Sequence, residues 1–285
     1  MHQRPAMPTT RRFHQLDVFT ATPLLGNPLA VMHDAHGLDE ATMATFARWT
    51  NLSESTFLLP PTDPRADYRV RIFTPGGELP FAGHPTLGSC AAWLEAGGVP
   101  RDADEVIQEC GVGLVRVRRD GARLAFAAPP LRRTGPLDAS LVERISRGLG
   151  IDAAQVRHHQ WVDNGPGWCA VMLPSADVVR QLRPDIAQLE RLMLGVVGAC
   201  APGDDTAFEV RVFVPGHGVA EDPVTGSLNA GLAQWLIGAG LAPAQYVAAQ
   251  GSALGRAGRI HVEHDGVDVW IGGDVVVCIR GDVTL

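Results

Sequence analysis

The sequence predicts an α+β protein made of two similar halves. Short stretches of alternating apolar and β-branched residues are mixed with alanine- and leucine-rich stretches that are typical of helices. One strand-and-turn phrase occurs twice, as RIFTPG at residues 71–76 and as RVFVPG at residues 211–216. Each copy precedes a polar segment with glycine and then a helix-like run, which indicates a duplicated structural unit.

Alternation and β-branched residues predict strands at Phe13–Phe19, Tyr68–Phe73, Leu114–Val117, Phe208–Phe213 and Val267–Ile271, with a last strand from Val275. A first helix is expected from Leu38 through DEATMATFARW. Two further helices follow the segments GHPT and DPVTGS, over residues 87–98 and 228–240. Both end in glycines, the expected stop signal of a helix.

The repeat extends beyond one phrase. Four residues of RIFTPG recur at an offset of 140, and the segments NPLAVM at 27–32 and GWCAVM at 167–172 are separated by the same offset. A period of this length indicates a duplicated domain and not a solenoid. We therefore expect a first lobe of residues 1–130, to which residues 275–285 return, and a second lobe of residues 131–274.

Composition narrows the class of function. The 285 residues carry a formal net charge of -7 with both signs mixed along the chain, which disfavours nucleic-acid binding. No apolar run reaches the length of a membrane span. The first 15 residues are basic but lack the apolar core of a signal peptide, so a frayed tail before Phe13 is expected. No GxGxxG or GxxxxGK[ST] loop indicates a nucleotide cofactor.

The five cysteines are odd in number and scattered, without a CxxC pair. This pattern favours a reduced, cytoplasmic setting over a disulfide framework or a zinc site.

The segments GHPT and TGS offer a way to bind an anion without a basic side chain. If both helices point their N-termini at one cleft, the free backbone N–H groups form a two-sided trap for a small carboxylate. The alternative is that both segments are ordinary helix-entry turns, because Pro, Thr and Ser begin helices. Their matching positions in the duplication favour the shared site.

The motifs GNPLAV, NLSES, FTPGGELPFAGHPTLG and EDPVTGS, taken together, resemble the phenazine-biosynthesis PhzF-like isomerase family from about Leu16 to the C-terminus. The resemblance implies the fold of diaminopimelate epimerase, in which each of two pseudo-symmetric lobes is a mostly antiparallel sheet curled around a central helix. It also implies an active site between the lobes, no metal or organic cofactor, and commonly a homodimer.

Carried over by motif, the resemblance implies that Glu54 of NLSES transfers a proton and that His84, Asp222 and Ser227 assist it. The residues expected to bind substrate are Asn27, Gly83, Thr225 and Gly226. At the two glycines a side chain would obstruct the approach of substrate to the backbone. Ser55 and Leu228 depart from the residues that many relatives carry, and Leu228 is expected to reshape the pocket floor.

Each of these residues also has a plainer interpretation. Glu54 can cap the strand that follows it, His84 can be an ordinary loop histidine, and Asp222 before proline can simply form a turn. In the functional interpretation, partial burial raises the pKa of Glu54 so that it both accepts and returns a proton near neutral pH. A nucleophilic Ser227 is disfavoured because DPVTGS is not a GxSxG elbow.

Racemases of this architecture carry a cysteine on each side of the cleft, whereas PFAGHP and DPVTGS contain none. The sequence therefore predicts a cofactor-independent isomerase that shifts a proton on a small carboxylate substrate with one carboxyl group. An epimerase of the same fold and a non-catalytic protein that binds a ligand or a partner remain the alternatives.

Overall fold

The computed structural model describes residues 9–216 and 220–285. Within these residues, sixteen strands form one large mixed sheet, accompanied by five α-helices and two short 3₁₀ turns. The N-terminal strands are β1 (Thr10–Val18), β2 (Asn27–Met32), β3 (Glu54–Leu59), β4 (Tyr68–Thr74), β5 (Gly77–Leu79), β6 (Glu105–Cys110), β7 (Gly113–Asp120) and β8 (Arg123–Ala127). The later strands are β9 (His158–Trp161), β10 (Trp168–Leu173), β11 (Met193–Ala199), β12 (Phe208–Phe213), β13 (Gln245–Gln250), β14 (Gly258–His264), β15 (Val269–Gly273) and β16 (Val275–Thr284).

The two halves of this sheet repeat one pairing pattern. The neighbours run in the order β16-β1-β2-β3-β4-β6-β7-β8-β15-β14-β13-β12-β11-β10-β9, with β5 beside β4. The parallel pairs β2–β3 and β4–β6 correspond to β10–β11 and β12–β13, and the remaining pairs are antiparallel. The antiparallel pair β8–β15 joins the halves, and β16 pairs with β1.

The repeated phrase has the same structural role in each copy. Each arginine binds a glutamate that follows the turn: Arg71 binds Glu78 and Arg211 binds Glu221. Each pair makes two nitrogen–oxygen hydrogen bonds of 2.6 to 2.9 Å. Each guanidinium carbon also lies 5.1 Å from the centre of the phenylalanine ring two residues later. An arginine, a phenylalanine and a turn are therefore needed together at both places.

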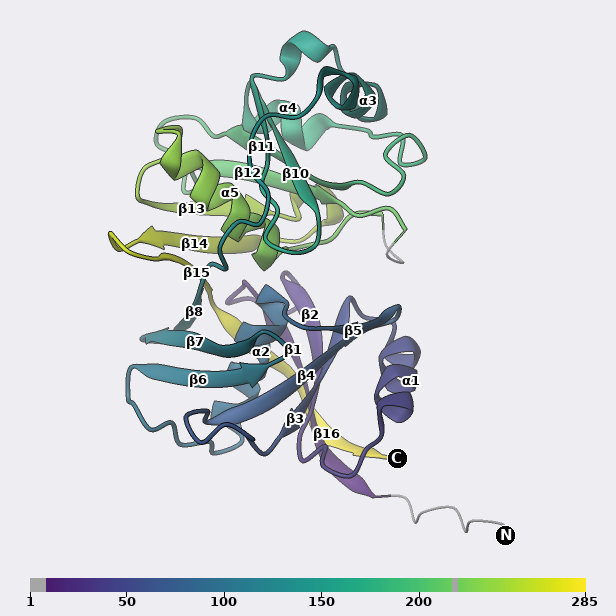
Figure 1. Cartoon of the computed structure of the whole chain (residues 1–285), viewed down its shortest axis with the longest axis vertical. Helices are drawn as coiled ribbons and strands as arrows, with labels where there is room; N and C mark the ends of the chain where they lie inside the picture. Colours follow the sequence, from purple (N-terminus) through teal and green to yellow (C-terminus); the bar gives the residue numbers. More distant parts are fainter. Residues whose placement is uncertain (1–8, 217–219) are drawn as a thin grey trace.

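The helices are α1 (Glu40–Thr50), α2 (Gly83–Glu95), α3 (Ala139–Leu149), α4 (Ala176–Gln181) and α5 (Gly226–Gly238), and the 3₁₀ turns are η1 (Ala153–Gln155) and η2 (Ser252–Leu254). Figure 1 shows α2 among the strands β1 to β8 and β16 in its lower part, and α5 among β9 to β15 in its upper part. Nine of the 13 residues of each of these two helices are buried, which is why both are apolar on nearly every face.

Several predicted boundaries were wrong by a few residues. Strand β1 begins at Thr10, within the predicted tail, because Thr10 pairs with Thr284 of β16. Strand β15 begins at Val269, two residues later than predicted, because the Asp265 side chain accepts hydrogen bonds from the N–H groups of Val267 and Asp268 and holds them in a turn. Residues 1–8 of the predicted tail lie outside the described residues.

The segment GHPT is the first turn of α2 and not a loop before it, since the helix begins at Gly83 after the N-cap residue Ala82. Likewise α5 begins at Gly226 after the N-cap residue Thr225. In the described part of the chain, no helix combines the length and apolar character that a membrane span requires.

Candidate active site

Strand pairing places Asn27 and Glu54 at the same end of two neighbouring strands. They are the first residues of β2 and β3, and these strands run in parallel with Leu29 opposite Glu54. Parallel neighbours begin at the same edge, so residues 27 positions apart in the chain share one location. Asn27 is completely buried, whereas the side chain of Glu54 keeps 15% of its surface exposed and is thus within reach of solvent.

His84 lies in the first turn of α2 beside both residues. Its Nε2 lies 3.4 Å from Glu54 Oε2, and its Nδ1 lies 3.4 Å from the amide nitrogen of Asn27. An amide nitrogen only donates, so Nδ1 accepts and the ring proton resides on Nε2, facing Glu54. Burial lowers the pKa of His84 to about 3, which keeps the ring neutral.

Asp222 belongs to the other half of the chain, and both of its carboxylate oxygens accept hydrogen bonds. Asn27 Nδ2 and Ser53 Oγ donate to Oδ1 over 3.2 and 3.4 Å, and the Thr225 hydroxyl contacts Oδ2. Burial raises the pKa of Asp222 to about 6, although these hydrogen bonds act in the opposite direction. Asn27, which also contacts His84, therefore connects the two halves.

Glu54 has a strongly raised pKa. Burial, and secondly the nearby charge of Asp222, raise its pKa to about 8. Its Oε2 atom and His84 Nε2 are both buried without a hydrogen bond in the described residues, because their 3.4 Å approach lacks suitable geometry. A carboxyl group in this state can hold a proton at neutral pH and can also give it up.

The first residues of α2 and α5 touch each other. A methyl group added at Gly83 would lie 2.9 Å from Gly226 Cα, and one added at Gly226 would lie 3.0 Å from Gly83 Cα and 3.2 Å from the His84 backbone nitrogen. These glycines, predicted to admit substrate, are thus already required for the contact of two backbones. Neither N-cap residue, Ala82 or Thr225, caps its helix through a side-chain hydrogen bond.

Ser227 is held by residues from the second half of the chain. Its Oγ accepts a hydrogen bond of 3.1 Å from the indole nitrogen of Trp168, and its carbonyl accepts one of 2.7 Å from Asn164 Nδ2. An indole nitrogen only donates, so the Ser227 hydroxyl proton is left for another acceptor. Leu228, expected at the pocket floor, is fully buried and packs towards Gly195 of β11.

The structure brings together all eight residues singled out from the sequence, through the contact of the two helix starts and the contacts of Asn27 and Thr225 with Asp222. Sequence reasoning missed Ser53, Asn164, Trp168 and Gln250. Ser53 stands within the NLSES motif directly before Glu54 and was recognisable there. The other three carried no signal, because their role depends on contacts between distant segments.

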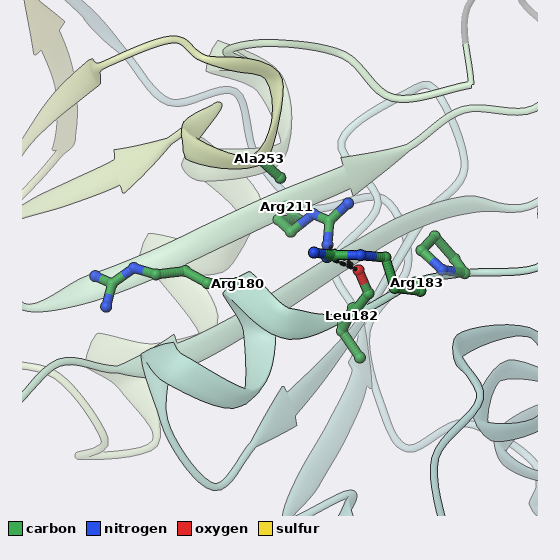
Figure 2. Close-up of a pocket in the computed structure, with 6 residues that line it drawn as sticks. Arg180, Leu182, Arg183, Arg211 and Ala253 are labelled. Carbon is green, nitrogen blue, oxygen red and sulfur yellow. Dashed lines mark hydrogen bonds between the residues drawn. The ribbon is translucent and has the colours of Figure 1, made fainter.

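Two cavities of the described residues lie elsewhere. The larger, of about 530 Å³, is lined by Arg180, Leu182, Arg183, Pro184, Arg211 and Ala253, and Figure 2 shows its three arginines. A second, of about 360 Å³, borders the end of α5 and β9. Arg211 already holds Glu221 and donates to the carbonyls of Val179 and Leu182, so its guanidinium is a structural group.

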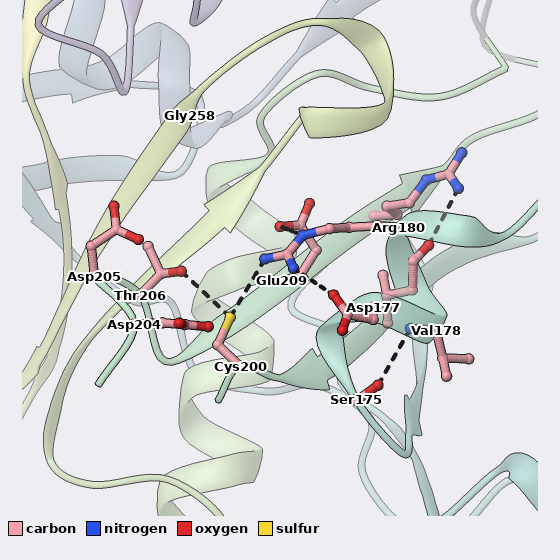
Figure 3. A network of polar contacts seen from close by, with 12 residues as sticks. Ser175, Asp177, Val178, Arg180, Cys200, Asp204, Asp205, Thr206, Glu209 and Gly258 are labelled. Carbon is pink, nitrogen blue, oxygen red and sulfur yellow. Dashed lines mark hydrogen bonds and ion pairs between the residues drawn. The ribbon is translucent and has the colours of Figure 1, made fainter. Parts of the chain in front are cut away.

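Arg180 is likewise engaged, as Figure 3 shows. It binds Glu209 over 3.1 Å and Asp177 over 3.0 Å, and its NH2 group lies 3.8 Å from Cys200 Sγ. Glu209 is buried on β12, so this ion pair ties α4 to the sheet. Glu54 and His84 combine strongly shifted pKa values with buried atoms that lack a hydrogen-bond partner in the described residues, and we place the candidate site there.

Metal ligands and thiols are the other groups that such a site can use. Within residues 9–216 and 220–285, no three His, Cys, Asp or Glu side chains are grouped to hold a metal ion. Cys90, on α2 beyond the first turn, is buried in the core, and this burial raises the pKa of its thiol to about 12. A thiol with this pKa stays protonated at neutral pH.

Comparison with known proteins identifies the family. Residues 16–281 match the family model of phenazine biosynthesis-like proteins. The chain belongs to this family. The trans-2,3-dihydro-3-hydroxyanthranilate isomerase of Pseudomonas fluorescens is 33% identical, over 95% of this chain and 98% of that one. The resemblance inferred from the motifs is therefore confirmed.

Solved structures agree with this assignment. A PhzF-family protein from Enterococcus faecalis superposes with a TM-score of 0.82 at 25% identity, covering 97% of this chain and all of that one. A predicted epimerase from Pseudomonas aeruginosa superposes with a TM-score of 0.76 at 30% identity, covering 96% of this chain and 99% of that one. Relatives across the whole chain are named isomerases or epimerases, and this protein is an enzyme of that type.

The acidity of Glu54 makes the stability of the protein depend on pH. Its pKa is higher in the folded protein, about 8, than its ordinary value of 4.5, so its contribution to stability is complete below pH 4.5 and is lost as the pH rises to about 8. Glu54→Gln removes this loss. We expect the variant to be more stable than the wild type at pH 9, by on the order of a few kcal/mol, and the difference to vanish near pH 4.5.

Chemical denaturation of both proteins at a series of pH values measures this difference. His84 opposes the trend at low pH, because its lowered pKa makes both proteins lose stability below about pH 6.5 in the same way. A constant difference between variant and wild type across the range would contradict the raised pKa of Glu54.

Proposed function

We propose that this enzyme shifts a proton on a small carboxylate substrate, with the carboxyl group of Glu54 as the acid and base and without a cofactor. The observation that carries the proposal is the pKa of Glu54, raised to about 8 in a buried position next to the neutral ring of His84. A group with this pKa is matched to a proton transfer that must run in both directions near neutral pH. The name of the Pseudomonas fluorescens relative describes an isomerase of a molecule that bears a carboxylate.

The substrate carboxylate is assigned to the first turns of α2 and α5. Both helix starts lack a side-chain cap and an acidic residue in the first turn, so their N–H groups and their positive dipole ends favour an anion. Opening of the Gly83–Gly226 contact admits the substrate, and closure of the two helix starts over the substrate excludes water. The overall negative charge of the chain is no obstacle to this binding, since the donors are backbone groups.

In the reaction, ionised Glu54 removes a proton from a carbon next to a π-system and returns it to another carbon on the same face. His84 Nε2 lies 3.4 Å from Glu54 Oε2 without a hydrogen bond in the described residues, and a small movement that aligns the two groups lets its N–H stabilise the carboxylate as the proton leaves. The charge of Asp222 has the opposite effect, since it favours the protonated form of Glu54 and drives the return of the proton. Ser227 has a hydroxyl proton available for the substrate, because Trp168 occupies its acceptor side.

Deuterium uptake tests this function. The protein is first dialysed against a chelator and then incubated in heavy water with a panel of small carboxylates that carry a C–H bond next to a π-system. We expect deuterium at a different carbon from the one that lost its proton. Label at the original carbon would show an epimerase instead, and binding with neither label nor conversion of the substrate to an isomer would show a non-catalytic binding protein.

Three features predicted from the sequence complete the proposal and stay predictions. The halves described above are two lobes, of residues 1–130 with 275–285 and of residues 131–274, with the site between them. The protein forms a homodimer and resides in the cytoplasm. The five free cysteines are in keeping with a reducing compartment.

A further inference from the structure

Gln250 occupies a position at the site that the reaction as proposed does not use. It ends strand β13, is 1% exposed, and directs all of its polar atoms at the segment around Asp222. Its Oε1 accepts hydrogen bonds from the Thr225 backbone N–H over 3.1 Å and from Asn229 Nδ2 over 2.8 Å. Its Nε2 donates to the Asp222 carbonyl over 3.1 Å and to Thr225 Oγ1 over 3.0 Å.

These partners determine the orientation of the amide. The two groups at Oε1 can only donate and the carbonyl at Nε2 can only accept, so a flipped amide would lose three hydrogen bonds. Gln250 therefore presents an N–H group to Thr225 Oγ1. The hydroxyl of Thr225 has a single hydrogen, and because its oxygen already accepts from Gln250, that hydrogen is directed at Asp222 Oδ2.

Asp222 is then surrounded by donors. Thr225 donates to Oδ2, while Asn27 Nδ2 and Ser53 Oγ donate to Oδ1. A carboxylate has about four acceptor sites and accepts all three hydrogen bonds, and these bonds are stronger to the charged form than to a carboxylic acid. The arrangement therefore favours the ionised form of Asp222.

The other charged or titratable groups around Asp222 do not supply this preference. The negative charge of the neighbouring Glu221 raises the pKa of Asp222, and Glu221 is paired with Arg211. Between Asp222 and Glu54 on β3, the charge of Asp222 raises the pKa of Glu54. His84 on α2 is neutral. Hydrogen bonds from neutral donors are thus what stabilises the Asp222 anion against burial.

We propose that Gln250 is a positioning residue that orients the Thr225 hydroxyl and thereby keeps Asp222 a fixed anion that is not a proton carrier. This assignment rests on the proposed function only in its consequence for Glu54: the fixed charge of Asp222 makes Glu54 the single group at the site that both takes up and releases a proton. The hydrogen-bond arrangement itself is a property of the protein without substrate.

The test is a direct titration of Asp222 by NMR in protein labelled with ¹³C at the aspartate carboxyl carbons, with the Asp222 signal assigned by its loss in Asp222→Asn. Thr225→Val removes the hydroxyl donor, and Gln250→Met removes the group that orients it. Loss of a hydrogen bond to a charged group is expected to raise the pKa of Asp222 by about one to two units in both variants.

Two control variants make the result specific. Thr225→Ser keeps the hydroxyl and is expected to titrate like the wild type. Gln234→Met makes the same chemical change at a part-buried glutamine of α5 that donates a hydrogen bond to the Pro129 carbonyl, and it should leave the pKa of Asp222 unchanged. If Gln250→Met does not fold, Thr225→Val against Thr225→Ser decides the matter.

An Asp222 pKa in folded Thr225→Val that equals the wild-type value overturns the proposal, as does an equal rise in Thr225→Ser. Because the titration needs no substrate, its result is separable from that of the deuterium experiment. A shifted Asp222 pKa in a protein that labels no carboxylate would retain this arrangement and remove the proposed function. Deuterium labelling of a carboxylate together with an unshifted Asp222 pKa in Thr225→Val would retain the proposed function and remove this arrangement.

Discussion

Glu54→Gln is expected to lower turnover by about two to four orders of magnitude, the usual contribution of a positioned acid or base. The substitution nearly preserves the shape of the side chain but removes the proton that Glu54 exchanges. Substrate binding should persist, because the carboxylate is assigned to the helix starts and not to Glu54. Steady-state kinetics gives the loss in kcat, and isothermal titration with substrate reports binding.

The matched control is Glu143→Gln, which makes the same change at an exposed position of α3. It should retain wild-type turnover. A Glu54→Gln enzyme that works at the wild-type rate would exclude Glu54 from the reaction, whatever its pKa.

Gly226→Ala is expected to abolish most activity and to destabilise the fold by about 1–3 kcal/mol, the usual range for overpacking. The added methyl group would lie 3.0 Å from Gly83 Cα and 3.2 Å from the Gly83 carbonyl carbon and the His84 nitrogen. These are backbone atoms at the start of a buried helix, so they have no rotamer into which to move. The two helix starts would separate, and His84 would shift relative to Glu54.

Gly238→Ala, at the last residue of the same helix, controls for the change of residue type. A methyl group there meets no atom within 4 Å, so this variant should be neutral or slightly stabilising, as is usual for alanine in place of glycine in a helix. Thermal melting and turnover of the two variants test the contrast. Equal behaviour of Gly226→Ala and Gly238→Ala would show that the close contact of α2 and α5 is not needed.

The predicted elements agreed with the structure where a local pattern was strong. Phe208–Phe213 coincides with β12, and Tyr68–Phe73 lacks only the last residue of β4. Both helices that follow the polar segments exist, but each begins earlier than predicted, because glycines such as Gly83 and Gly226 are more typical of loops than of a first helical turn. Buried helix starts tolerate glycine when another backbone must approach, and nothing local in the sequence shows that approach.

The sequence by itself determined the family, and it predicted a duplicated plan and Glu54 as the acid. These depend on short motifs and their order, which survive without knowledge of contacts. Only the tertiary structure decided the pKa of Glu54. Asn27, Glu54, Asp222 and Gln250 lie in segments spread over nearly the whole chain, and the pKa of Glu54 is raised because folding buries it and brings Asp222 beside it. Proton affinity is set by burial and by neighbouring charges and donors, so a sequence can name the titratable residue while the fold determines when it titrates.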